Sequence, residues 1–205
     1  MTGARAEVLG RIRTALGSAP PAAVRVPRDY DRQALTGRGD VERFAETVAD
    51  YRACVHRVRP SEVAVTIAAL VGAGTAVIPA ELPPDWVTGI HTVVDDPPVG
   101  LDVLDRVDAV VTGCALGIAA TGTIVLDAGV AQGRRALTLV PDHHVCVIRT
   151  DQIVDTVPQA FSALDPSRPL TFISGPSATS DIELQRVEGV HGPRTLDVVI
   201  VGVDR

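Results

Sequence analysis

The sequence predicts a three-layer α/β fold with an open, mostly parallel sheet and a short antiparallel part. Short segments rich in valine and isoleucine alternate with helical patterns, which is typical of parallel strands connected by helices. Hydrophobic residues make up 46% of the 205 residues but aromatic residues only 3%, so the core must consist of the aliphatic side chains that suit buried strands. In the middle of the chain, four successive apolar segments leave no room for helices and predict hairpins.

The first 38 residues are expected to form a helix and an extended arm outside the main domain, which spans residues 39–205. The helix is predicted over residues 4–16, where four apolar side chains recur at helical spacing: Val8, Leu9, Ile12 and Leu16. The stretch 18–38 contains proline and shows no period. Because so short a helix can bury its apolar residues only against something else, we expect self-association or partner binding through this region.

The main domain is predicted to begin with two helices. Asp40 is the expected N-cap of the first helix, and an apolar stripe continues from there as far as Tyr51 and Val55. The second helix is expected to begin at Ser61 and to end at the glycines of residues 72–74.

The remaining elements alternate between strands and helices. The predicted strands are residues 75–78, 91–94, 108–112, 114–119, 123–126, 137–140, 145–149, 170–173 and 196–201. A helix is expected over residues 151–164, and a short one from about Asp181, with Ser180 and Glu183 in a capping box.

Composition excludes several classes of function. The net charge is −6, and the scattered arginines form no basic patch for nucleic acid. Lysine is absent, which excludes a Schiff-base or P-loop lysine. Three cysteines without Cys-x-x-Cys spacing argue against disulfides and iron–sulfur clusters and favour a cytoplasmic location. No dinucleotide fingerprint and no 18-residue apolar segment are found, so we expect no cofactor and no membrane insertion.

Two hydroxyl-rich segments beside strands are candidate ligand sites. Thr121 and Thr123 flank Gly122, so hydroxyls and backbone N–H groups can face an anion there; an ordinary tight turn is the alternative. The second segment follows the strand 170–173. Its candidate ligand residues are Ser174, Gly175, Ser177 and Thr179.

A third segment precedes the last strand and contains His191, Gly192 and Arg194. The imidazole suits acid–base work and the guanidinium suits a carboxylate or phosphate; a histidine packed on a helix end is the alternative. Because open α/β sheets gather such loops at one edge, we expect all three segments to form one anion pocket at the carboxyl edge of the sheet.

A metal site is not expected. His143 and His144 are adjacent on a predicted strand and should therefore point to opposite faces. A zinc site needs three or four converging ligands. The sequence gives no reason for its candidate ligands to converge, which are Cys114, Cys146, His91, His143 and His191.

Residues 113–126, the segment Ile173–Glu183 and the segment Gly189–Pro193 together resemble three ordered blocks of the LUD-domain family. The resemblance covers residues 105–202 best. It implies a fold similar to the superfamily of sugar-phosphate isomerases and coenzyme A transferases. It also implies a role in oxidising L-lactate to pyruvate beside iron–sulfur partner subunits. Ala120 stands where we expect an acidic residue in many relatives, which argues against a catalytic carboxylate at this position.

The sequence therefore predicts a component without an iron–sulfur cluster, binding a small carboxylate or phosphate in a lactate-oxidising system, with His191 as the candidate catalytic residue. Two alternatives stay open. One is a free-standing enzyme acting on a phosphosugar or an acyl-CoA-type anion, and the other is a metabolite-binding module without turnover.

Overall fold

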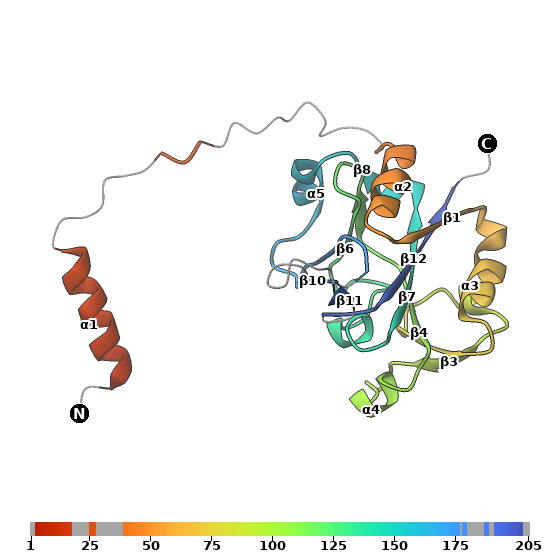
Figure 1. Ribbon diagram of the computed structural model, residues 1–205, viewed down its shortest axis with the longest axis horizontal. Helices are drawn as coiled ribbons and strands as arrows, with labels where there is room; N and C mark the ends of the chain where they lie inside the picture. Colours follow the sequence, from red (N-terminus) through yellow and green to blue (C-terminus); the bar gives the residue numbers. More distant parts are fainter. Residues whose placement is uncertain are drawn as a thin grey trace. The chain divides into compact units, whose positions relative to one another are not determined.

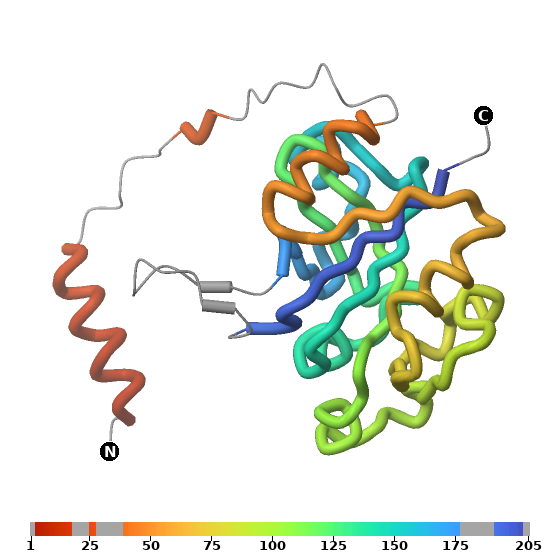
Figure 2. Tube along the Cα trace, turned by 45° about the vertical axis from the view of Figure 1, so that its right-hand side comes forward, coloured from red at the N-terminus to blue at the C-terminus, as the bar shows by residue number. Residues whose placement is uncertain are grey.

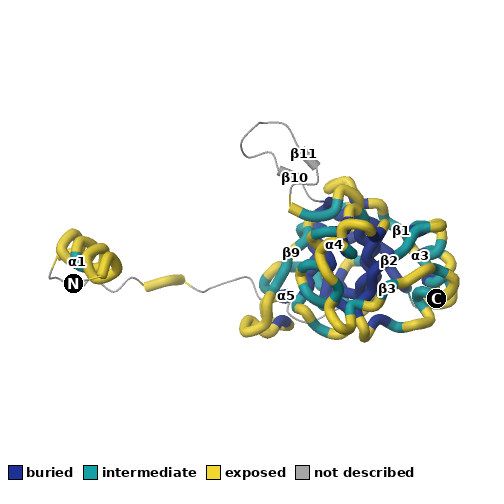
Figure 3. Tube along the Cα trace, turned by 90° about the horizontal axis from the view of Figure 1, so that it is seen from below, coloured by how far each residue is buried: buried dark blue, intermediate teal, exposed yellow. Residues whose placement is uncertain are grey.

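The computed structural model describes residues 3–17, 25–27, 39–176, 178–179, 187–188 and 191–202. The chain divides into two compact units, Met1–Tyr30 and Asp31–Arg205. In the first unit, α1 (Ala4–Leu16) is present as predicted and buries none of its residues (Figure 3).

The second unit contains the remaining elements (Figure 1). Its helices are α2 (Val41–Asp50), α3 (Val63–Val71), α4 (Leu101–Leu104) and α5 (Val157–Ala163), with single 3₁₀ turns η1 (Pro60–Glu62), η2 (Pro84–Val87), η3 (Arg135–Thr138) and η4 (Thr150–Gln152). Its strands are β1 (Cys54–Val58), β2 (Thr75–Ile78), β3 (His91–Val94), β4 (Ala109–Thr112), β5 (Leu116–Ile118), β6 (Thr123–Leu126), β7 (His143–Arg149), β8 (Ile153–Val154), β9 (Thr171–Ile173), β10 (Ala178–Thr179), β11 (Val187–Glu188) and β12 (Thr195–Val201).

The main sheet has six strands in the order β1-β12-β7-β4-β2-β3. Every neighbouring pair is parallel, which confirms the predicted open parallel sheet. The last strand of the chain, β12, lies between β1 and β7 (Figure 2). Parallel strands must be joined by crossovers, and such a connection places β12 between two strands that precede it in the sequence.

A second sheet of four strands, in the order β8-β5-β6-β9, is mixed. The β5–β6 and β6–β9 pairs are antiparallel and the β5–β8 pair is parallel. This sheet confirms the predicted antiparallel part. The strands β10 and β11 form a separate antiparallel pair.

The two sheets and the helices of this unit form layers (Figure 1), and apolar side chains pack between them. One face of the main sheet packs on α3 through Ile67 and Val199. The other face packs on α2 and on the second sheet, where Phe44, Ile124 and Ile148 share one cluster. The far face of the second sheet packs on α5. Burying one such side chain fully contributes roughly 1.5–3 kcal/mol.

Two sequence predictions for the first half of the domain have different outcomes. Asp40 caps α2 as predicted, because its carboxylate accepts a hydrogen bond of 3.0 Å from the backbone N–H of Arg43. The stripe assigned to this helix, however, runs beyond its end at Asp50. Arg52 has a φ of +68°, which breaks the helix, and Val55 lies in β1, a strand that the sequence analysis missed.

Two predictions in the second half are wrong. Residues 137–140 are not a strand, because the chain forms the 3₁₀ turn η3 and Leu137 is buried against Leu104. The helix predicted over residues 151–164 begins only at Val157, where Pro158 occupies the first turn. Proline has no N–H and starts helices better than it continues them. The helix predicted from Asp181 lies outside the described residues.

No helix in the described part of the chain combines the length and the apolar character needed to cross a membrane.

Candidate functional site

A pocket of about 300 Å³ brings together the second and third polar segments. We call it the His191 pocket. Its lining residues are Arg135, Thr138, His144, Thr171, Phe172, Ile173, Ser174, Gly175, Pro176, His191, Gly192, Pro193 and Leu196. Ser177 lies outside the described residues, as does the side chain of Thr179.

The pocket does not lie at the edge of the sheet that we expected. His144 and Leu196 occupy paired positions in β7 and β12, one residue after the first residue of each strand. His191 belongs to the loop that enters β12. The His191 pocket therefore lies beside the amino ends of these parallel strands, and the predicted carboxyl edge is wrong for it.

The first polar segment contacts the pocket through hydroxyl groups rather than lining it. Thr121 Oγ1 and Thr123 Oγ1 are hydrogen-bonded at 2.7 Å, and Thr123 Oγ1 is hydrogen-bonded to Ser174 Oγ at 2.8 Å. A hydroxyl both donates and accepts. This row of three hydroxyls can therefore set the direction of the Ser174 proton, and Ser174 lines the pocket.

Two glycines of these segments have structural roles. Gly122 has a φ of +57°, and a Cβ built on it would lie 2.6 Å from the backbone of Thr47 in α2. Gly175 has a φ of +80°, and its Cβ would lie 2.3 Å from the carbonyl oxygen of Tyr51. Both turns pack directly on the backbone around the end of α2, and glycine permits this.

The guanidinium that faces the pocket belongs to Arg135, a residue that the sequence analysis missed. It donates to the carbonyl oxygen of Thr138 at 2.7 Å and to that of His191 at 3.5 Å. Burial lowers the pKa of Arg135 from its ordinary value. No carboxylate among the described residues forms an ion pair with it. Arg194, the predicted anion ligand, instead lies exposed, with its Nη1 3.3 Å from Asp142.

The adjacent histidines point to opposite faces of the sheet, as predicted. His144 is buried, with its Nε2 2.8 Å from Thr112 Oγ1. His143 Nε2 lies 2.7 Å from Asp197, whose other oxygen lies 2.5 Å from His56 Nε2. Within the part of the chain that the structure describes, no three His, Cys, Asp or Glu residues are grouped so that they could hold a metal ion.

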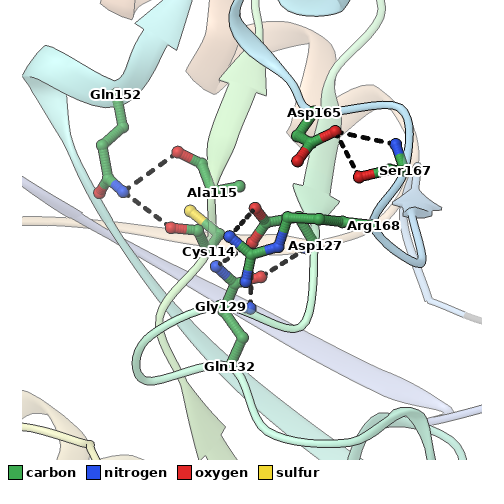
Figure 4. A network of polar contacts seen from close by, with 9 residues as sticks. All are labelled: Cys114, Ala115, Asp127, Gly129, Gln132, Gln152, Asp165, Ser167 and Arg168. Atoms are coloured by element: carbon green, nitrogen blue, oxygen red, sulfur yellow. Dashed lines mark hydrogen bonds and ion pairs between the residues drawn. The ribbon is translucent and has the colours of Figure 1, made fainter.

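A second and larger cleft, of about 580 Å³, opens beside Gly113 and Cys114, which follow β4, and beside Arg149 at the end of β7. We call it the carboxyl-edge cleft. Figure 4 shows one of its walls, in which Asp127, Gln132 and Arg168 are linked by hydrogen bonds and an ion pair. None of its lining residues belongs to the His191 pocket. No residue of this cleft was predicted from the sequence to bind a ligand.

These features define a protein with a parallel α/β sheet, a small polar pocket at one edge of the sheet and a larger cleft at the other. The sequence pattern of the LUD domain matches residues 102–201. "Lactate utilization protein C" of Deinococcus radiodurans is 46% identical over 206 residues, which cover 97% of this chain and 96% of the relative. The chain therefore belongs to the LUD domain family.

Two other comparisons agree with this assignment. A crystal structure of a DUF162 family protein from Deinococcus radiodurans superposes with a TM-score of 0.68 at 42% identity, covering 78% of this chain and 95% of that one. The Escherichia coli protein YkgG is 32% identical over 114 residues, which cover 50% of this chain and 49% of the relative.

Proposed function

We propose that the chain takes part in lactate utilisation, as a component without an iron–sulfur cluster, and that it binds a small carboxylate. The observation that carries the proposal is the 46% identity, over almost the full length of both chains, to a relative named lactate utilization protein C. Within such a system, the proposed reaction is the oxidation of L-lactate to pyruvate, and the proposed partners are iron–sulfur subunits.

The cysteines support the assignment of the clusters to partners. A typical cluster needs four thiolates, and this chain has three cysteines. Cys114 and Cys146 are buried in the core, whereas Cys54 is exposed on the first strand. The hydrogen bond with Cys146, together with burial, raises the pKa of Cys114 well above its ordinary value, so this residue stays a thiol at neutral pH.

The His191 pocket supports the choice of a small anion. Its lining includes the guanidinium of Arg135 and the hydroxyl of Ser174 but no Asp or Glu among the described residues. A volume of about 300 Å³ is at the small end of the range for ligand pockets. Both features favour a compact carboxylate held by a charge-assisted hydrogen bond.

L-Lactate carries a carboxylate and a hydroxyl on neighbouring carbons, and the pocket offers a group for each. In this proposal Arg135 binds the carboxylate, and the imidazole of His191 faces the hydroxyl. Oxidation to pyruvate removes two electrons and two protons. The imidazole can take the hydroxyl proton, the proton from C2 passes to solvent, and the two electrons pass to the clusters of the partner subunits.

Titration calorimetry of the purified chain with L-lactate and pyruvate tests this site. A charge-assisted hydrogen bond is worth roughly 1.5–3 kcal/mol, so Arg135→Gln should weaken binding about tenfold to a hundredfold. Arg194→Gln is the matched control, because that arginine pairs with Asp142 on the surface. Weaker binding in the control, with Arg135→Gln unchanged, would make Arg194 the anion ligand instead.

Growth on L-lactate tests the function in the cell. A strain without the gene should lose growth on L-lactate as the carbon source, and the unaltered gene should restore it. His191→Ala should fail to restore growth although the protein accumulates normally. Tighter binding of ribose 5-phosphate than of lactate, with normal growth of the deleted strain, would favour the free-standing enzyme on a phosphosugar.

A further inference from the structure

The carboxyl-edge cleft lies where open α/β sheets bind ligands, outside the carboxyl ends of the strands. The ends of β4 and β7 contribute Gly113, Cys114 and Arg149 to it, and Asp127 follows β6. Its volume of about 580 Å³ is almost twice that of the His191 pocket. A molecule as small as lactate would leave most of this space unfilled, so the cleft fits a larger ligand.

One wall of the cleft is aromatic. Trp86 is the single tryptophan of the chain, is half-buried, and lines the cleft beside Pro83. A Cβ built on Gly113 would lie 4.0 Å from Cζ3 of the Trp86 ring and 3.4 Å from the Cβ of Ala131. At these distances a methyl group at Gly113 would make ordinary van der Waals contact with the indole, so glycine leaves this part of the indole uncovered by a side chain. A planar ring of a ligand in the cleft can pack against the indole, as aromatic pairs do at centroid separations of about 4.5–7 Å.

The polar wall is a preformed loop (Figure 4). Asp127 Oδ1 accepts hydrogen bonds from the backbone N–H of Gly129 at 3.1 Å and from Gln132 Nε2 at 2.8 Å. The side-chain oxygen of Gln132 accepts from the backbone N–H of Asp127 at 2.6 Å. Ala128 and Ala131 have φ values of +53° and +62°. Strained residues of this kind persist only where their surroundings hold them, and they cluster at ligand sites.

The charged side chains of the cleft are paired, and the carboxylate of Asp127 is 13% exposed. Arg168 Nη1 lies 3.0 Å from Asp127, and Arg149 Nε lies 2.9 Å from Asp151. The two arginine side chains are 42% and 54% exposed. The paired charges leave the cleft close to neutral. The indole of Trp86 lies on one wall, and the two partly exposed guanidinium groups can still contact an anion.

From this arrangement we infer that the carboxyl-edge cleft binds a nucleotide, with the base packed on Trp86 and the phosphate beside Arg168. The inference is independent of the proposed role in lactate utilisation, because the two sites share no lining residue. A planar ring joined to an anionic group matches both walls, whereas a sugar phosphate leaves the indole uncovered.

The fluorescence of Trp86 reports binding directly, since no other tryptophan is present. Titration with AMP should change this fluorescence saturably, and calorimetry should give the same Kd. Adenosine should bind about tenfold more weakly, because it cannot contact Arg168. Ribose 5-phosphate should leave the fluorescence unchanged. If AMP gives no saturable signal up to millimolar concentrations, or if ribose 5-phosphate binds as tightly as AMP, the inference is overturned.

Three variants test the location of the nucleotide. Gly113→Ala places a methyl group beside the indole without a clash below 3.4 Å, so it should weaken AMP at least tenfold while the melting temperature stays constant. Arg168→Gln should weaken AMP but not adenosine. Arg106→Gln is the control, because that arginine pairs with Asp102 on α4. AMP binding that survives the first two variants, or that disappears in Arg135→Gln, would remove the nucleotide from this cleft.

Discussion

Gly122 allows its turn to pack against the backbone of α2, whereas the hydroxyls beside it make polar contacts. At a φ of +57°, with the backbone of Thr47 2.6 Å from the position of a Cβ, no side chain fits without movement of α2 or of the turn. Thr121 and Thr123 form the row of hydroxyls that ends at Ser174. The Thr-Gly-Thr segment thus combines a packing requirement at its centre with polar contacts on either side.

Gly122→Ala should therefore destabilise the folded domain by about 1–3 kcal/mol, through left-handed backbone strain and overpacking. Urea unfolding followed by circular dichroism measures this directly. Gly10→Ala is the control, because Gly10 lies in α1 with nothing within 4 Å of the added Cβ, and alanine favours a helix. Equal unfolding midpoints for Gly122→Ala and the unaltered chain would show that the turn moves away from α2 at little cost.

Asp197 is a buried carboxylate on the main sheet that contacts two imidazoles. Its side chain is 7% exposed and lies between His56 and His143, which belong to the neighbouring strands β1 and β7. Burial raises the pKa of Asp197, but the hydrogen bonds with His143 and His56 outweigh burial, so the pKa lies below its ordinary value. The charged carboxylate is therefore the form that stabilises the fold.

A lowered pKa has a defined consequence for stability. The contribution of Asp197 is fully present above its unfolded pKa of about 3.9 and is lost as the pH falls through the lower, folded value. Asp197→Asn should cost about 1.5–3 kcal/mol at pH 7, because the hydrogen bonds of the two imidazoles to a charged group are lost. The difference from the unaltered chain should shrink below about pH 4. A difference that is constant from pH 7 to pH 3 would contradict a stabilising carboxylate.

Residue types alone predict part of the candidate site. The sequence pointed to Ser174 and His191 because hydroxyls and an imidazole stood in glycine-bearing loops beside strands, and both residues line one pocket. Arg135 carried no such signal, since its place in the pocket depends on the 3₁₀ turn η3 lying next to the His191 loop. Only the tertiary structure brings the Arg135 side chain to the pocket.

At the scale of elements, the sequence predicts a helix or strand correctly where the segment is long or bounded by clear signals. The strand β12 and the helix α2 both begin near their predicted starts. The shortest elements are not predicted from the sequence. The two-residue strand β8 pairs with β5 and interrupts what reads as one helical segment. Pairing between distant strands outweighs local propensity there, and no local pattern shows it.

The N-cap of α2 provides a test at this scale. The Asp40 carboxylate accepts a hydrogen bond from the N–H of Arg43, and the Asp40 N–H donates to the carboxylate of Asp155 at 2.7 Å. Asp40→Ala should lower the free energy of unfolding by about 0.5–2 kcal/mol, the usual cost of losing such a cap. Asp40→Asn should cost much less, because an amide oxygen also caps. If both variants unfold alike, the cap contributes nothing specific to α2.

At the scale of the whole molecule, amino-acid composition predicts the core because it limits which side chains can fill it. With aromatic residues at only 3%, the layers had to be packed by aliphatic side chains, and the core clusters consist almost entirely of Val, Ile, Leu and Ala. The order of strands in the main sheet was not predictable in the same way. That β12 inserts between β1 and β7 depends on contacts between residues far apart in the chain.

The last prediction concerns the N-terminal unit. Its helix α1 buries no residue, and its apolar side chains Val8, Leu9, Ile12 and Leu16 are 36–75% exposed. An isolated helix of this length is marginal in water, so contact with a second copy of the chain would stabilise it. A chain that begins at Gly39 keeps the hydrogen bond of 2.8 Å from Gly39 to Ile153. It should therefore keep the melting temperature of the domain but sediment as a smaller species than the full chain. Ile12→Ser in the full chain should have the same effect on sedimentation without any deletion. A truncated chain that melts at a lower temperature would instead make the N-terminal unit part of the folded core, and equal sedimentation of all three proteins would exclude it from self-association.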